Sequence, residues 1–273
     1  VASRLLSQRT GIDQGFDTWD EPEREARGAE EVGLRAARWL RARSKPGSRF
    51  FLWVHFFDPH RPLEPPEHFR ARALSGTTQD TPFAELEQRL YLAEIAYADA
   101  EVGRLVDGLA ERIGDAELLV ACVADHGEAF GEHGEQSHGL LVFDTTMRVP
   151  LLLQHPRLPA GLVVERAISS ADLAPTLLGL LGIEAEGMSG RDLAPLLVDA
   201  RAPLPEATPV YLETCHSLYS YGWSPLFALV EGDLKVVEGP HPAVYDLARD
   251  PGEELNLAAE RPDLAGPALA RVA

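Results

Sequence analysis

Residues 124–150 read ADHGEAFGEHGEQSHGLLVFDTTMRVP and connect two apolar segments, Glu117–Ala124 and Val149–Gln154. Each apolar segment has the length of a β-strand that is covered on both faces. The connection holds more ligating groups than a packed core requires: Asp125, His126, Glu128, Glu132, His133, Glu135, His138 and Asp144. Open α/β sheets place their sites at the carboxyl ends of strands. The stretch therefore predicts such a sheet, with a metal site or phosphate or sulfate chemistry in this connection.

The composition is that of an ordinary globular protein and argues against two classes of partner. The chain has 273 residues, 45% of them hydrophobic and 25% charged, which suffices for one large or two smaller domains. Its net charge is −18 and it has no basic run with interleaved aromatic residues. We therefore expect neither nucleic acid nor an anionic membrane surface as the main partner. An anionic substrate would need a local positive charge, which a bound metal ion can supply.

Neither the cysteines nor the hydropathy fixes a compartment. Only Cys122 and Cys215 are present, so there is no disulfide framework. No apolar run reaches the roughly 18 residues of a membrane span. The sequence opens at Val1 without an initiator methionine, so we expect the true N-terminus, with any targeting segment, to lie upstream.

The first half of the chain alternates apolar runs with amphipathic segments. Pro22 suits the first turn of a helix whose apolar face continues to Leu40. Residues 50–57, FFLWVHFF, have the length and composition of a buried parallel strand. Thr81 can cap a long helix that runs to Ile113. This order of strand, helix and strand predicts a parallel sheet with helices on its faces.

The second half of the chain ends in short strands. Asp172 can cap a helix over Leu173–Leu181, and a short helix is expected over Arg191–Val198. The prolines of Ala200–Pro209 mark a boundary. Beyond it we expect four strands, a hairpin turn and a helical tail: Val210–Thr214, Leu226–Val230, Leu234–Val237, Ala243–Leu247, the turn at Gly232-Asp233, and the tail from Glu253. The predicted domains are therefore residues 1–200 and a C-terminal subdomain, 201–273.

Asp125 and His126 are candidate metal ligands. A carboxylate and a neutral imidazole together suit Ca²⁺, Mn²⁺ or Zn²⁺. Neighbouring residues of a strand point to opposite faces, so both reach one ion only where the chain turns, and Gly127 permits that turn. The alternative is a solvated pair of loop residues, but the position directly after an apolar strand favours the metal site.

His60 and His138 are candidates for acid–base or anion-binding roles. His60 follows residues 50–57 in a loop bracketed by prolines, and an imidazole can protonate a leaving oxygen or bind an anion. The alternative for His60 is a surface histidine that caps the strand. His138 lies far enough past His126 for the loop to fold back over a metal. Other polar residues of the connection are expected to form a solvated loop face: Glu132, His133 and Glu135.

Five collinear segments resemble the sulfatase family of the alkaline phosphatase superfamily. They read FLWVHFFDPHRPLEPP at 51–66, YLAEIAYADAEVGRLVDGL at 91–109, ADHGEAFGEHGEQSHGLLVFDTTMRVPLLL at 124–153, SSADLAPTLLGLLGI and GMSGRDLAPLL within 169–197, and AVYDLARDPGEELNLA at 243–258. The resemblance implies an α/β fold, an alkaline-phosphatase-like sandwich with a mostly parallel central sheet between helices. A small C-terminal antiparallel α+β subdomain would follow. Residues 11–21 and 221–240 resemble a bacterial branch that is sometimes fused to tetratricopeptide repeats.

The resemblance also implies roles, cofactors and a substrate class. Asp125 and His126 would be two ligands of one divalent metal ion, Ca²⁺ first, with Mn²⁺ and Zn²⁺ as alternatives. His60 would contact the sulfate and the leaving group, and His138 would bind a nonbridging oxygen. The family's nucleophile is a formylglycine made from Cys or Ser, whose hydrate attacks sulfur while a histidine protonates the departing alcohol. The substrate would be a sulfated small molecule or glycan.

Two parts of the family pattern have no counterpart in the sequence. The nucleophile motif and the first metal segment are absent, so we expect both upstream of Val1 and expect residues 1–273 alone not to hydrolyse sulfate esters. A periplasmic or membrane-associated location rests on the family alone, and any membrane association would come from upstream segments.

The missing nucleophile leaves alternative functions open. The Asp-His-Gly motif and the later His-Gly motif also occur in phosphomonoester, phosphodiester and phosphonate-ester hydrolases and in phosphoethanolamine transferases of the same superfamily. A threonine nucleophile would favour phosphoryl transfer, whereas Cys or Ser would favour sulfate. A third alternative is a non-catalytic relative that keeps the fold for binding and has lost the nucleophile.

Overall fold

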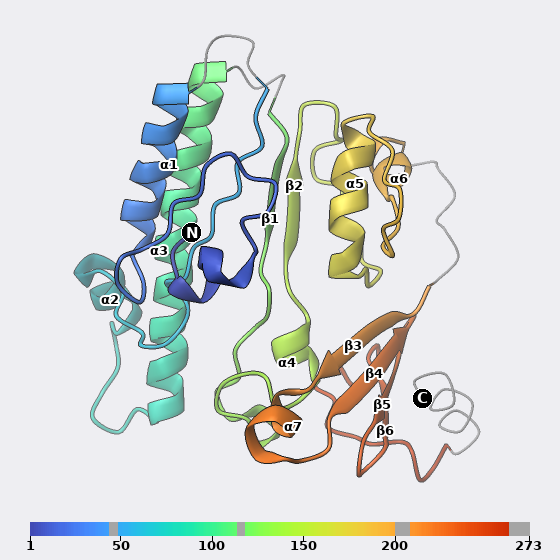
Figure 1. The fold of residues 1–273 in the computed structure, drawn as a ribbon. Coiled ribbons are helices and arrows are strands. Elements are labelled where there is room, and N and C mark those ends of the chain that lie inside the picture. The colour runs from blue at the N-terminus through green and yellow to red at the C-terminus, as the bar shows by residue number, and fades with distance from the viewer. Residues whose placement is uncertain (44–48, 114–117, 200–207, 262–273) are drawn as a thin grey trace. The chain divides into compact units, whose positions relative to one another are not determined.

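The protein forms two compact units, Val1–Val120 and Ala121–Ala273. The computed structural model describes residues 1–43, 49–113, 118–199 and 208–261 (Figure 1). The expected division near residue 200 stays a prediction, because residues 200–207 lie outside the described part. Among the described residues, no helix has both the length and the apolar character needed to cross a membrane.

Three helices frame the first unit, α1 (Ala29–Arg43), α2 (Glu67–Ala73) and α3 (Phe83–Ile113). Two short 3-10 turns, η1 (Arg4–Leu6) and η2 (Gln8–Thr10), precede them. Both α1 and α2 pack along α3, the long helix in Figure 1. The expected long helix is confirmed over Phe83–Ile113.

The first helix begins at Ala29, so the prediction that it starts at Pro22 is wrong. Its first N–H groups are capped by distant side chains. The Ala29 N–H donates to Asp58 Oδ1 at 2.8 Å, and the Glu30 N–H donates to the Tyr97 hydroxyl at 3.1 Å. The segment before it cannot be helical, because its backbone hydrogen-bonds to the N-terminal segment instead.

Residues 51–57 have no strand partner in the described part of the chain. The side chains of Trp53, His55 and Phe57 follow one another along one side, with ring centroids 6.4 and 5.9 Å apart, as expected for alternate residues of an extended segment. The prediction of a hydrogen-bonded strand is therefore wrong for the described residues. A β-ladder needs a neighbour, and none of the described strands supplies one here.

A buried carboxyl group on α3 makes the stability of the first unit depend on pH. Glu94 is 4% exposed and accepts a hydrogen bond from the Glu64 N–H at 2.7 Å. Burial, reinforced by the nearby negative charges of Asp58 and Glu64, raises the pKa of Glu94 from 4.5 to about 7. Because the folded-state pKa is raised, this group favours the fold at low pH. The contribution is lost as the pH rises from about 4.5 to 7.

We expect Glu94→Gln to raise the free energy of unfolding by about 2–3 kcal/mol at pH 8 and to change it little at pH 4. Glutamine keeps an acceptor oxygen for the Glu64 N–H but never carries the buried charge. Denaturant unfolding at both pH values measures the effect. The control Glu85→Gln removes an exposed carboxylate that pairs with Arg89 on the same helix, and it should shift stability by less than about 1 kcal/mol. Equal effects of Glu94→Gln at the two pH values would contradict the raised pKa.

The second unit ends in an antiparallel sheet. The strands are β3 (Val210–Thr214), β4 (Leu226–Glu231), β5 (Leu234–Glu238) and β6 (Ala243–Asp246), neighbours in that order. The registers pair Leu212 with Ala228 and Val236 with Val244. These strands and the turn at Gly232, where φ is 60°, confirm the expected C-terminal sheet. Its buried cluster consists of Val142, Ala228, Val237, Ala243 and Tyr245.

A pair of strands leads into and out of the candidate site. β1 (Val120–Val123), at the junction of the two units, lies beside β2 (Leu151–Gln154) (Figure 1). Strands were expected at both places. The expected burial of the first is wrong, because Ala121–Val123 are exposed. β2 is its one neighbour among the described strands.

Short helices complete the second unit: η4 (Glu132–Gly134), α4 (Asp144–Met147), η5 (Ser170–Asp172), α5 (Leu173–Leu180), α6 (Ala194–Val198) and α7 (His216–Tyr221). Ser169 and Asp172 form a capping box at the start of η5, just before α5. The helix expected over Arg191–Val198 begins only at Ala194, because the Arg191 N–H and guanidinium bind Asp172 instead.

The prediction of a helical tail is wrong over residues 253–261, which are irregular apart from a turn at 258–260, and residues 262–273 lie outside the described part. The Asp250 carboxylate accepts hydrogen bonds from the N–H groups of Glu254 and Leu255 at 3.1 and 2.8 Å. A side chain that satisfies these backbone donors holds the segment in a turn.

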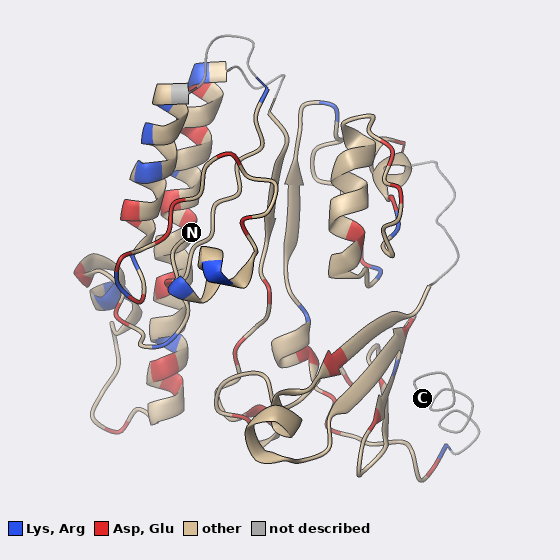
Figure 2. Cartoon of the chain, in the orientation of Figure 1, with Lys and Arg blue, Asp and Glu red and all other residues tan. Residues whose placement is uncertain are grey.

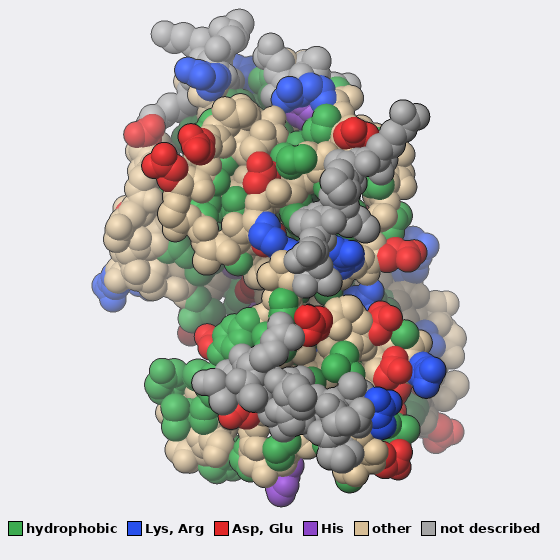
Figure 3. Space-filling view, turned by 90° about the vertical axis from the view of Figure 1, so that its right-hand side faces the viewer, with side chains coloured by type: hydrophobic (Ala, Val, Ile, Leu, Met, Phe, Trp, Pro, Cys, Tyr) green, Lys and Arg blue, Asp and Glu red, His purple; other side chains and the backbone are tan. Residues whose placement is uncertain are grey.

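Charges are mixed on the surface. On the face shown in Figure 3, the coloured Lys and Arg side chains lie scattered among Asp and Glu and form no continuous basic area. This distribution agrees with a sequence that has no basic run.

Candidate active site

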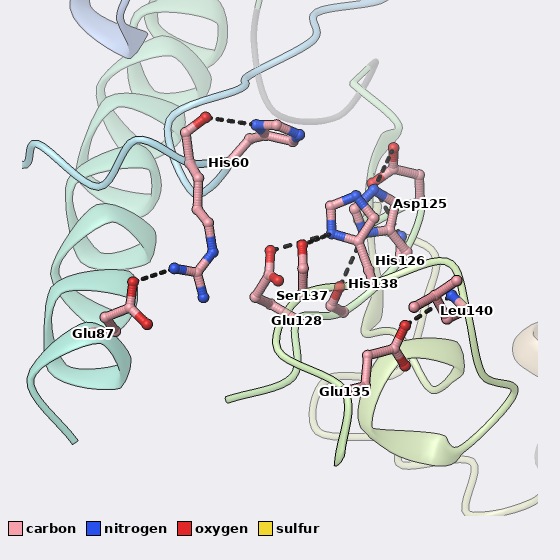
Figure 4. A network of polar contacts seen from close by, with 11 residues as sticks. His60, Glu87, Asp125, His126, Glu128, Glu135, Ser137, His138 and Leu140 are labelled. Carbon is pink, nitrogen blue, oxygen red and sulfur yellow. Dashed lines mark hydrogen bonds and ion pairs between the residues drawn. The ribbon is translucent and has the colours of Figure 1, made fainter. Parts of the chain in front are cut away.

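Asp125 and His126 lie where the chain turns after β1. The His126 N–H donates to Asp125 Oδ1 at 3.0 Å, and Asp125 Oδ2 lies 3.7 Å from His126 Nε2 (Figure 4). The His126 Nδ1–H donates to the carbonyl oxygen of Gly127 at 2.9 Å. This hydrogen bond leaves the lone pair of the neutral imidazole on Nε2, the nitrogen that faces the carboxylate.

The two side chains fit part of the ligand set of a divalent cation. Ligand bonds of about 2.0–2.6 Å are compatible with two donor atoms 3.7 Å apart. The Asp125 side chain is 82% exposed, so its oxygens can be reached. No group of three or more His, Cys, Asp and Glu residues in the described part could hold a metal. Further ligands would therefore have to come from other groups, and metal binding by Asp125 and His126 stays a prediction.

His138 folds back onto His126, as the loop length predicts. The two imidazole rings stack with centroids 4.0 Å apart and planes inclined by 29°. His138 Nδ1 lies 3.2 Å from Glu128 Oε2 and 3.4 Å from Ser137 Oγ (Figure 4). The Glu128 side chain is only 4% exposed. A buried carboxylate that accepts a hydrogen bond from an imidazole fixes the tautomer and orientation of the ring.

The sequence did not reveal this role of Glu128. Its position directly after Asp-His-Gly was the available signal, but many loop acids occupy such positions. What distinguishes Glu128 is burial against His138, which only the folded loop shows.

The loop that carries His138 is held by its own polar groups. Glu135 is 5% exposed and its carboxylate accepts a hydrogen bond from the Leu140 N–H at 2.8 Å, so the expectation of a solvated Glu135 is wrong. Glu132 is exposed, as expected. The ring of His133 stacks on Phe143 with centroids 3.6 Å apart, so it supports the loop rather than the candidate site.

His60 belongs to the first unit. Its Nδ1 lies 2.8 Å from the carbonyl oxygen of Arg61, and its ring stacks on Phe57 with centroids 4.4 Å apart. The Arg61 guanidinium pairs with Glu87 on α3 (Figure 4). These contacts hold the histidine loop against the helix. Because Asp125, His126 and His138 belong to the second unit, the convergence of His60 on the same point stays a prediction.

A buried lysine ties the candidate site to the C-terminal sheet. Lys235 of β5 is fully buried, and its Nζ lies 2.9 Å from Asp144 Oδ1 and 2.7 Å from Glu253 Oε1. Glu253 also accepts a hydrogen bond from the Asp144 N–H at 2.6 Å, which caps α4. The Gly127 N–H donates a hydrogen bond to the backbone carbonyl oxygen of Thr146 in α4 at 2.7 Å, so the network reaches the loop of Asp125 and His126.

Gly127 is required by a close backbone approach. A Cβ atom at this position would lie 2.4 Å from the carbonyl oxygen of Thr145. We expect Gly127→Ala to displace the turn, to lower the free energy of unfolding by about 1–3 kcal/mol and to weaken divalent-metal binding. Thermal unfolding and calorimetric metal titration measure the two effects.

The matched control for this substitution is Gly103→Ala in α3, where an added Cβ meets nothing within 4 Å. This change should stabilise the helix by about 0.5–1 kcal/mol. Unchanged metal affinity in the Gly127 variant would show that the turn does not position the proposed ligands.

Comparisons with known proteins match most of the chain. A family model described as Sulfatase matches residues 15–183. A choline-sulfatase of Rhizobium meliloti is 34% identical over 179 residues, 63% of this chain and 33% of the relative. Arylsulfatase K of Xenopus laevis is 26% identical over 224 residues, 75% of this chain and 40% of the relative. The chain thus spans about a third to two fifths of these relatives.

The fold has a close counterpart among solved structures. The phosphonate monoester hydrolase of Agrobacterium radiobacter superposes with a TM-score of 0.73 at 22% identity, covering 90% of this chain and 61% of that one. At this identity the likeness concerns the fold alone. It confirms the predicted alkaline-phosphatase-like α/β class, with the antiparallel sheet at the C-terminal end.

Proposed function

Because the chain belongs to the sulfatase family, we propose that the protein is a sulfuric ester hydrolase, which converts a sulfate ester and water into an alcohol and sulfate. The observation that carries the proposal is the cluster of Asp125, His126 and His138 at the end of β1. This cluster lies inside the segment that the family model matches. The chain covers only 33–40% of these relatives, so hydrolysis by the whole protein is itself part of what we propose.

In this proposal Asp125 and His126 hold one divalent cation, for which Ca²⁺ is the first candidate and Mn²⁺ and Zn²⁺ are the alternatives. The carboxylate supplies negative charge and Nε2 of His126 supplies the lone pair that its hydrogen bond to Gly127 leaves there. His138 binds a nonbridging oxygen of the ester, held in place by the buried Glu128. His60 gives a proton to the departing alcohol oxygen, with its ring oriented by the Arg61 carbonyl.

A bound cation would supply Lewis acidity at the ester oxygens, and a formylglycine from a segment outside this sequence would supply the nucleophile. The residues of this chain would position the ester, bind its charge and move the leaving-group proton. Similarity to a choline-sulfatase supports a sulfated small molecule as substrate, with a sulfated glycan as the alternative.

The direct test is an assay of the full-length protein against three ester classes, with Ca²⁺, Mn²⁺ or Zn²⁺ added. We expect the highest kcat/KM for sulfate esters. A preference for phosphonate or phosphate monoesters would replace the proposal by the phosphoryl-transfer alternative. Absence of turnover with all three classes, in protein that binds metal, would favour a non-catalytic relative.

A further inference from the structure

An exposed aromatic surface begins beside the loop that carries His138. The hydroxyl of Thr214 donates to the carbonyl oxygen of Gly139. Immediately afterwards, α7 starts at His216, whose Cγ lies 3.7 Å from the place that a Cβ on Gly139 would occupy. Both contacts lie within the second unit, where α7 and this loop are neighbours (Figure 1). The start of α7 is therefore continuous with the candidate site.

The rings that follow form a preorganised surface. Tyr221 and Trp223 stack with centroids 4.9 Å apart and planes inclined by 29°. Gly222 between them has φ 70° and ends α7, and the Trp223 N–H donates to the carbonyl oxygen of Ser217 at 3.2 Å. The rings of His216 and Tyr221 are inclined by 76°, with centroids 6.1 Å apart. We call His216, Tyr221 and Trp223 the aromatic platform.

The platform is exposed and its segment carries no formal charge. Tyr221 is 56% exposed and Trp223 is 61% exposed. No Asp, Glu, Lys or Arg occurs between Glu213 and Glu231, and α7 is free of charge colours in Figure 2. The segment is instead rich in serine and tyrosine hydroxyl groups.

A sugar ring matches this chemistry better than the other ligands of a sulfatase. A pyranose presents an apolar C–H face that stacks on aromatic rings, while its hydroxyls pair with hydroxyl groups around them. A second sulfate would require a cationic partner. A quaternary ammonium group is recognised by a cage of aromatic rings that surrounds it. The segment supplies no cation for a sulfate, and Tyr221 and Trp223 stack on each other as an exposed flat surface, not as a cage.

We propose that the aromatic platform binds a sugar ring of the sulfated substrate. The inference rests on the proposed function for the sulfate, but the contact with the sugar depends only on the platform. Gly139 follows His138 directly, so the platform extends from the residue proposed to bind the ester. A glycan could then place its sulfate at the candidate site and a sugar ring on Tyr221 and Trp223.

The test is calorimetric titration of the full-length protein with unsulfated methyl glucoside, methyl galactoside and N-acetylglucosamine, each followed by its 6-sulfate. We expect saturable binding of at least one unsulfated sugar. Trp223→Ala should weaken it about tenfold, the scale of one lost aromatic contact, and Trp223→Phe should restore part of the loss. Thermal unfolding of each variant checks that the fold is kept.

The matched control is Tyr211→Ala. Tyr211 of β3 is 49% exposed and stacks with Phe227 of β4. The substitution therefore removes an exposed, stacked ring that lies outside the platform. Sugar affinity should stay within about twofold in this variant. An equal loss in the Tyr211 and Trp223 variants would contradict a specific site.

Three further outcomes would overturn the sugar site or the proposed function. Binding of choline or phenol with no binding of any sugar would overturn the proposal in favour of a cation or an aromatic leaving group. Hydrolysis of sulfate esters without sugar binding would leave the proposed function standing and refute the platform. Sugar binding through Trp223 without hydrolysis of any sulfate ester would keep the platform and refute the proposed function.

Discussion

Replacing Asp125 with asparagine is expected to weaken Ca²⁺ binding by at least about 100-fold and to lower kcat/KM toward sulfate esters by a similar or larger factor. Loss of a residue behind the metal ligands already costs about 10–100-fold in affinity or activity, and loss of a ligand should exceed that. The amide is close in shape to the carboxylate, so the His126 N–H keeps its acceptor while the negative charge disappears. The variant therefore separates charge from local structure.

The measurement is a calorimetric Ca²⁺ titration of metal-stripped full-length protein, followed by the ester assay at saturating metal. The control Glu184→Gln removes the same charge from an exposed position of the second unit and should leave the affinity unchanged. If D125N bound Ca²⁺ as tightly as the parent protein, Asp125 would not be a ligand. A matching loss in His126→Gln would show that both side chains serve one ion.

Replacing His60 with alanine is expected to lower turnover by roughly 10²–10⁴ for esters of poorly acidic alcohols. The effect should shrink for activated aryl esters, because a good leaving group departs without a proton. Two contacts orient the proposed acid: the Arg61 carbonyl oxygen accepts a hydrogen bond from His60 Nδ1, and Phe57 stacks on the imidazole ring.

Two comparisons check this role for His60. His68→Ala removes another histidine from the first unit and should leave the dependence on the leaving group unchanged, because His68 lies in α2 and contacts Phe69. A plot of turnover against the pKa of the leaving alcohol should become steeper only in the His60 variant. Parallel plots for the parent protein and the variant would remove the proposed role as an acid.

Local sequence patterns predicted correctly the elements whose hydrogen-bonded residues lie close together in the sequence. The long helix α3 and the hairpins of β3–β6 follow from apolar spacing and from the turn at Gly232, because both ends of each contact lie within a short stretch. The same holds for the return of His138 onto His126, where a short loop with glycines leaves few other paths.

Elements that depend on distant partners were the ones predicted wrongly. Helix α1 starts where Asp58 and Tyr97 cap it, and neither partner is visible in the local pattern around Pro22. Residues 50–57 have the composition of a strand, but composition does not supply the neighbour that makes a ladder. Glu128 was missed for the same reason, since its partner His138 is recognised only after folding.

We expect the network around Lys235 to couple the opening of the candidate site to the opening of the C-terminal sheet. Removing Lys235 from between Asp144 and Glu253 would leave two carboxylates without their buried cation, so the sheet cannot separate from α4 without a large penalty. The amide of Gly127 bonds to α4, and the amides of β5 bond to its neighbours in the sheet. In native-state hydrogen exchange these amides should open together, with one free energy and one dependence on denaturant. The loop of Asp125 and His126 would then be protected by the last strands of the chain, far from it in sequence.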